Sequence, residues 1–174
     1  MNFNDFDFEN NDNDDRIEFL SELSNMLEYL KPPLIDYEKF DIMSGTDNYG
    51  EYFKVIIPHK NNNTVNLCVS VYFTEIIVFI SGEHMHFEHY EKNEEKMIEA
   101  ICFISEILLG KMEICNYYKG DKLIKVKVYY INEQNKKELI STSNYSNISI
   151  FNPFFKNRVE NIRISYTNLH LKCL

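Results

Sequence analysis

The feature that most constrains the fold is a run of alternating apolar residues that begins at Val65. Apolar side chains recur at every second position from Val65 to Phe73, and this period of two is typical of an antiparallel strand with one buried face. The next segment, 76–80, is apolar at every position. A strand with two apolar faces is expected inside a sheet, with neighbours on both sides. The most patterned region therefore opens with two strands.

The pattern continues through a third strand, a helix and two further strands. The third strand, at 83–90, carries three of the five histidines of the chain. Apolar residues at helical spacing predict a helix over 94–109, and Gly110 is suited to the left-handed position that follows a helix. Strands are predicted at 112–118 and 124–130 because apolar and polar residues alternate there.

Weaker signals extend the pattern towards both ends of the chain. A leucine-rich stripe predicts a helix over 15–30, which Pro32 should end because proline lacks a backbone donor. A short strand is predicted at 52–57, and two weaker strands at 147–151 and 159–166.

Strand-rich order with only two helices argues against a doubly wound parallel sheet. We therefore expect an α+β fold, with one mostly antiparallel sheet of about six to eight strands and two main helices packed on one face. A chain of 174 residues is most simply one domain, which we place at 14–174. Residues 1–13 have too few contiguous apolar positions to drive folding, and we expect a mobile acidic tail.

The charge and cysteine content restrict the class of partner. Lys and Arg number 18 against 27 Asp and Glu, a formal net charge of −9, which argues against nucleic acid or an anionic membrane as the main partner and suits a basic protein. No apolar run approaches the about 18 residues of a membrane span. The four cysteines form no Cys-x-x-Cys pair, so we expect a reduced, cytoplasmic protein.

The histidine strand is the one local group of residues that suggests a site. Strand alternation directs Met85 and Phe87 towards the core. The residues expected together on the opposite face are His84, His86, Glu88 and Tyr90. Two imidazoles on one strand face are a known metal-binding arrangement, but a catalytic zinc needs a third ligand, and the sequence indicates none. The other interpretation is a polar sheet face that meets water or a partner.

Enzymatic chemistry has little support in the sequence. There is no nucleophile elbow, P-loop, dinucleotide fingerprint or His-Glu-x-x-His motif. Glu83 and Glu88 should lie on opposite strand faces, which disfavours joint acid–base work, and a thiolate pair of Cys115 with a histidine rests on chance spacing. We predict no catalytic residues, no metal and no cofactor, and therefore no enzyme.

A lysine-rich stretch at 119–137 has two interpretations. It holds six lysines beside Tyr129 and Tyr130 but no arginine, the residue that makes forked contacts with bases and phosphates. A nucleic-acid strip is one interpretation. We favour the other, in which the lysines solubilise an exposed strand face and protect an edge from pairing.

The stretch 80–124 resembles the immunity proteins of polymorphic and contact-dependent toxin systems. The residues that carry this resemblance are Gly82-Glu83-His84-Met85-His86-Phe87, Tyr90-Glu91, the helical Ala100, Phe103, Ile104, Ile107 and Leu108, Gly110-Lys111, and Lys119-Gly120-Asp121-Lys122. The resemblance implies a binding protein that covers a cognate bacterial toxin domain. Many such toxins are nucleases with basic clefts, which an acidic protein would meet by charge complementarity.

The candidate partner-binding residues are Glu83, His84, His86, Glu88 and Tyr90. Three alternatives remain open. One is a small metal-dependent enzyme built on His84 and His86, and another is a phage-type acidic inhibitor that mimics nucleic acid. The third is an assembly protein whose tyrosines and phenylalanines form an oligomer interface.

Overall fold

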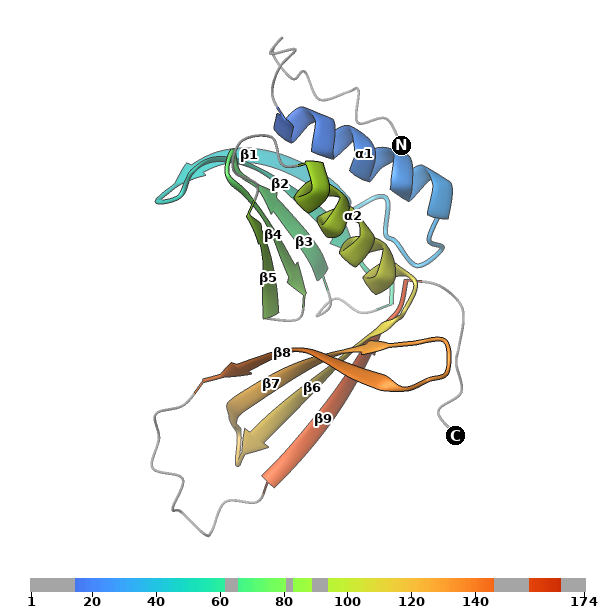
Figure 1. Cartoon of the computed structure of the whole chain (residues 1–174), viewed down its shortest axis with the longest axis vertical. Helices are drawn as coiled ribbons and strands as arrows, with labels where there is room; N and C mark the ends of the chain where they lie inside the picture. The colour runs from blue at the N-terminus through green and yellow to red at the C-terminus, as the bar shows by residue number, and fades with distance from the viewer. Residues whose placement is uncertain (1–14, 62–65, 81–82, 89–93, 146–156, 167–174) are drawn as a thin grey trace. The chain divides into compact units, whose positions relative to one another are not determined.

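A computed structural model places two helices and two antiparallel sheets along the chain, which confirms the α+β, sheet-dominated class (Figure 1). The structure describes residues 15–61, 66–80, 83–88, 94–145 and 157–166. The tail expected at 1–13 and the strand expected at 147–151 lie outside these residues. The chain divides into two compact units, 1–105 with 166–168 and 106–165 with 169–174. A single domain stays a prediction.

The first unit contains a five-stranded sheet in the order β1-β2-β3-β4-β5, with every neighbouring pair antiparallel. Its strands are β1 (Asp41–Asp47), β2 (Gly50–Pro58), β3 (Asn66–Val71), β4 (Glu75–Ile80) and β5 (Glu83–Glu88). The interior position predicted for 76–80 is confirmed, since β4 pairs on both sides. The histidine strand β5 is an edge of the sheet.

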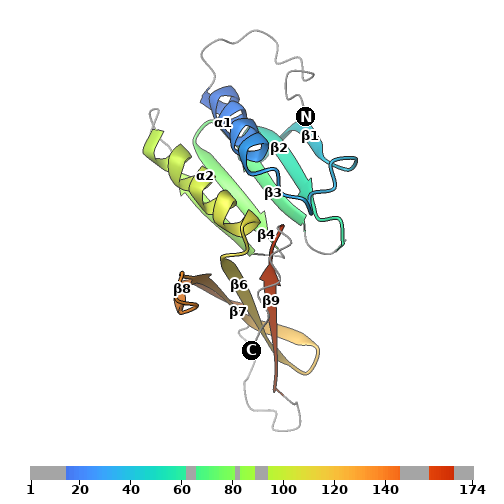
Figure 2. The same cartoon turned by 90° about the vertical axis from the view of Figure 1, so that its right-hand side faces the viewer.

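The two helices, α1 (Asp15–Leu30) and α2 (Glu94–Leu108), agree closely with the predicted ranges and cover one face of this sheet (Figure 2). The Arg16 guanidinium of α1 lies 4.9 Å from the ring centroid of Phe53 in β2. In α2, the Phe103 ring lies 5.6 Å from that of Phe87 in β5. Within the described part of the chain, neither helix is long and apolar enough to cross a membrane.

Tyr166 completes the core of the first unit, although it lies 99 residues after Leu67 and 109 residues after Ile57 in the sequence. Its side chain is fully buried. The hydroxyl donates to the carbonyl oxygen of Ile57 at 3.0 Å and accepts from the amide of Leu67 at 3.2 Å. Its own carbonyl accepts from the amide of Leu34 at 3.1 Å. One side chain thus joins β2 and β3 inside the core, and burial raises its pKa.

The second unit contains a separate four-stranded sheet in the order β8-β7-β6-β9. Its strands are β6 (Met112–Lys119), β7 (Lys122–Ile131), β8 (Lys137–Asn144) and β9 (Asn157–Ile164). The predicted single sheet of six to eight strands is therefore wrong, since the described strands form two separate sheets. Alternation identifies strands but not their partners, and here β6 pairs with β7 and β9 while β5 pairs with β4 alone.

Two edge strands, β1 and β8, were missed by the sequence analysis. In β1 Ile42 is the one buried residue, and in β8 none is buried, so neither segment shows an alternating pattern. Pairing with β2 and β7 stabilises them instead. The β1–β2 turn is helped by Asp47, whose carboxylate accepts from the amide of Tyr49 at 2.8 Å, and by Gly50, whose φ of 121° favours glycine.

Candidate partner-binding surface

The predicted alternation of the histidine strand is confirmed over the described residues of β5. Phe87 is 9% exposed on the face that the helices cover, whereas His84, His86 and Glu88 are exposed on the other, which we call the open face. Glu83 was proposed as part of the binding surface, but it is 5% exposed and lies on the helix-covered face. It therefore does not belong to the exposed group. Tyr90 lies outside the described residues.

The neighbouring strand β4 adds two residues that the sequence analysis did not include. Phe79 pairs with His84 across the strands, and the two ring centroids are 5.6 Å apart. The His84 and His86 rings meet edge to face at 4.9 Å. Glu75 of β4 contacts His86. The β5 surface is therefore defined as Glu75, Phe79, His84, His86 and Glu88.

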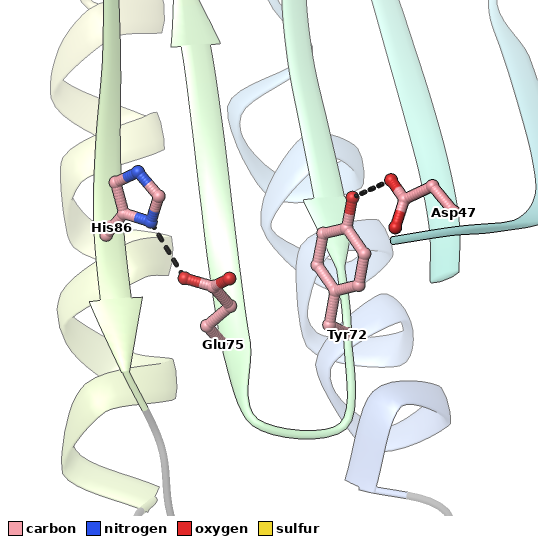
Figure 3. Close-up of polar contacts among 4 residues, drawn as sticks. All are labelled: Asp47, Tyr72, Glu75 and His86. Atoms are coloured by element: carbon pink, nitrogen blue, oxygen red, sulfur yellow. Dashed lines mark hydrogen bonds and ion pairs between the residues drawn. The ribbon is translucent and has the colours of Figure 1, made fainter. Parts of the chain in front are cut away.

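The contact between His86 and Glu75 fixes the orientation of the imidazole. Nδ1 of His86 lies 2.7 Å from Oε2 of Glu75 (Figure 3). A carboxylate only accepts hydrogen bonds, so Nδ1 carries the proton in this pair, and Nε2 is the nitrogen left to meet a partner. The pair thereby presents one ring nitrogen in a defined direction, as second-sphere carboxylates do for functional histidines.

A second polar pair lies on the same face of the sheet. The hydroxyl of Tyr72 donates to Oδ2 of Asp47 at 2.8 Å (Figure 3). The ring of Tyr72 lies 5.6 Å from that of Tyr52. The amide of Tyr72 donates to the carbonyl of Glu75 at 2.9 Å, which links this pair to the His86 pair through the β3–β4 turn. Burial, followed by the hydrogen bond to Asp47, raises the pKa of Tyr72 to about 12.

Stability should therefore fall at alkaline pH through Tyr72. Between pH 10 and about 12 the unfolded chain loses the Tyr72 proton while the folded chain keeps it, so unfolding is favoured as pH rises. Between pH 9 and 11 we expect the wild type to lose about 1 kcal/mol more than Tyr72→Phe, which has no proton to lose. Urea unfolding at the two pH values measures this. Equal losses in the two proteins would contradict it.

Two of the cysteines, Cys68 and Cys115, do not have the character of activated nucleophiles. Cys68 lies on the open face, where its backbone pairs with that of Phe79, but burial raises its thiol pKa. Burial, followed by a hydrogen bond to Glu113, also raises the pKa of Cys115 in the second unit. Catalytic cysteines have the opposite shift, because the thiolate is the reactive form. The thiolate pair considered for Cys115 thus finds no support in its surroundings.

The metal-site interpretation gains no third ligand from the described residues, among which no cluster of three or more His, Cys, Asp or Glu side chains is suited to hold an ion. His59 lies elsewhere in the sheet, with its ring 4.9 Å from that of Tyr166. His170 is outside the described residues. What the strands bring together at β5 is therefore an imidazole pair, one phenyl ring and two carboxylates.

Glu75 and Phe79 were missed because their relation to β5 depends on the β4–β5 register. That register pairs Glu75 with Glu88 and Phe79 with His84. The sequence contains no sign of this, because Phe79 lies in a run that is apolar at every position and its exposure is seen only in the structure.

Comparison of the chain with protein-family models, with curated proteins and with solved structures found no match. A functional assignment therefore depends on the surface described above, together with the charge of the chain and the resemblance carried by residues 80–124.

Proposed function

We propose that this chain is an immunity protein that binds a cognate bacterial toxin domain through the β5 surface and acts by surface complementarity, without chemistry of its own. The observation that carries the proposal is the run of ring contacts from Phe79 through His84 to His86 on the open face. Three rings held in place by strand pairing form a preorganised patch, which lowers the cost of binding a protein surface.

The composition of the patch supports a protein partner. Binding hot spots are small groups of aromatic or hydrogen-bonding side chains with a polar rim. Phe79 and the two imidazoles form such a group, and Glu75 and Glu88 lie beside it. The rim carboxylates would steer a basic surface towards the rings.

The charge of the first unit supports a basic partner. Residues 1–105 carry 21 acidic and seven basic side chains, a formal charge of −14. A field of this sign accelerates encounter with a positively charged protein, such as a nuclease with a basic substrate cleft. A cytoplasmic location is part of the proposal, since Cys68 and Cys102 are free thiols.

The test starts from the gene neighbourhood: a toxin domain encoded beside this gene is co-expressed with the chain. We expect the wild-type chain to restore growth and to form a complex that calorimetry detects. Phe79→Ala combined with His86→Ala should weaken binding at least tenfold, because truncating central hot-spot residues costs about 2 kcal/mol or more. The matched control is Tyr29→Ala, since Tyr29 is 87% exposed and belongs to α1, which covers the opposite face of the sheet.

Three outcomes would contradict the proposal or part of it. Loss of affinity in the Tyr29 control equal to that in the double variant would place the interface elsewhere. Binding of zinc at micromolar concentration to the metal-stripped chain, lost in His84→Ala, would favour the metal-dependent enzyme instead. Failure of the wild-type chain to protect cells or bind the domain would remove the immunity function itself.

A further inference from the structure

The net charge of the chain conceals a division between its two units. Residues 1–105 have a formal charge of −14, whereas residues 106–174 carry six acidic and eleven basic side chains, a charge of +5. The change of sign falls at the boundary between the two compact units. Because association depends on the local field near a surface, the second unit is able to attract anions that the whole chain would repel.

Strand register gathers much of this positive charge on one face of the second sheet. Tyr117 pairs with Lys125, Cys115 with Lys127, and Glu113 with Tyr129, so these residues share a face. Pairing between β7 and β8 adds Lys137 to it. We call this group the lysine face and define it as Tyr117, Lys119, Lys125, Lys127, Tyr129 and Lys137.

Aromatic rings lie among these lysines. The ammonium group of Lys127 is 5.8 Å from the ring centroid of Tyr117. Tyr117 and Tyr129 are half-buried, and a hydrogen bond between their hydroxyls is the main cause that raises the pKa of Tyr117. The rings of Tyr117 and Tyr129 thus lie among the ammonium groups of Lys125 and Lys127 on one face of β6 and β7.

Glu113 is the one acidic residue that the register places on this face within the described strands. It is 8% exposed, and it is occupied by an ion pair with Lys137 and a hydrogen bond from the thiol of Cys115. The other acids of β8 and β9, Glu138 and Glu160, pair with Tyr130 and Asn116 and so belong to the opposite face. The lysine face therefore keeps a net positive charge.

We propose that the lysine face binds single-stranded nucleic acid without strong sequence preference. Proteins of this kind combine cations that follow the phosphates with aromatic rings on which unpaired bases stack, and an open sheet face is a common platform. Lysine contacts phosphate as a point charge, so the lysines of this face predict weak base discrimination. This site is separate from the β5 surface and does not depend on the toxin proposal.

The other occupant that charge would allow is the acidic unit of a second copy. Tyrosine rings set among lysines favour nucleic acid, because this is the arrangement on which unpaired bases stack while the cations contact the phosphates. The two occupants make different predictions for a variant that removes a ring but keeps the charge.

The experiment is fluorescence anisotropy of a labelled 15-nucleotide oligothymidine titrated with the full chain at 50 mM salt. We expect a dissociation constant on the order of micromolar and a slope of about −2 to −3 for log affinity against log salt, since each neutralised phosphate contributes about −0.7. Lys125→Glu with Lys127→Glu should weaken binding at least tenfold. Tyr117→Leu should weaken it at least fivefold while leaving the salt slope unchanged.

The matched control is Lys31→Glu with Lys60→Glu, which changes the net charge equally but lies in the first unit. We expect its affinity to stay within twofold of the wild type. Equal weakening by both double variants, or no anisotropy change up to 100 µM protein, would overturn the proposal. Sedimentation velocity tests whether a second copy of the chain occupies the face instead. If the chain self-associates, if Lys125→Glu with Lys127→Glu abolishes this self-association, and if no oligonucleotide binds, the face would be assigned to a second copy.

Discussion

Replacing Tyr166 by alanine should lower the free energy of unfolding of the first unit by about 3 to 5 kcal/mol, the range for removing a large buried aromatic side chain. Tyr166 is fully buried, and its hydroxyl forms hydrogen bonds with both β2 and β3. The alanine variant loses the packing of the ring and leaves the Ile57 carbonyl and Leu67 amide without their partner. Urea unfolding followed by circular dichroism measures the loss.

Two companion variants separate the contributions of Tyr166. Tyr166→Phe keeps the ring and removes the hydroxyl, so it should cost about 1 to 3 kcal/mol, the penalty for unsatisfied buried backbone groups. Tyr29→Ala removes an aromatic side chain that is 87% exposed and should change stability by less than about 0.5 kcal/mol. If Tyr166→Ala cost no more than Tyr29→Ala, the role of Tyr166 in this core would be wrong.

Replacing Gly110 by alanine should destabilise the second unit by about 2 to 4 kcal/mol. Gly110 follows α2 with a φ of 76°, a left-handed conformation that costs an L-residue about 1 to 2 kcal/mol. An added Cβ would also lie 2.7 Å from Oγ and 2.8 Å from Cβ of Ser165, so the chain must shift to admit it. Thermal and urea unfolding would report the loss.

A double-mutant cycle isolates the steric part of the Gly110 effect. Ser165→Gly removes both of the close atoms, so in the Gly110→Ala background it should restore about 1 to 2 kcal/mol relative to its effect in the wild type. Gly120→Ala serves as a reference for conformation alone, because Gly120 has a similar φ of 62° in the β6–β7 turn. Strict additivity of Gly110→Ala and Ser165→Gly would show that the contact with Ser165 is unimportant.

The elements that the sequence predicted well are those with a strong local period. The helices over 15–30 and 94–109 and the strand at 124–130 are found where they were predicted, and the predicted strand from Val65 to Phe73 is found as β3, with Leu67, Val69 and Val71 buried. The C-terminal position of Gly110 was also predicted, and its positive φ confirms it.

The candidate site was predicted only in part. Alternation placed His84, His86 and Glu88 on one exposed face, as the structure has them, because side-chain direction in a strand depends on the strand alone. Glu83 was also included, although alternation puts it on the opposite face from Glu88, and the structure buries it. Phe79 was missed because it joins the group through pairing with another strand.

Local patterning was thus enough to establish the secondary structure class and the direction of side chains in the strongly alternating strands, because each depends on neighbours within a few positions. Strand partnership was settled by tertiary structure alone. The return of β9 to β6 and the hydrogen bonds of Tyr166 to β2 and β3 are both contacts between residues far apart in the chain. The spacing of apolar residues within one element does not encode such contacts, because they form only when separate elements pack together in the folded chain.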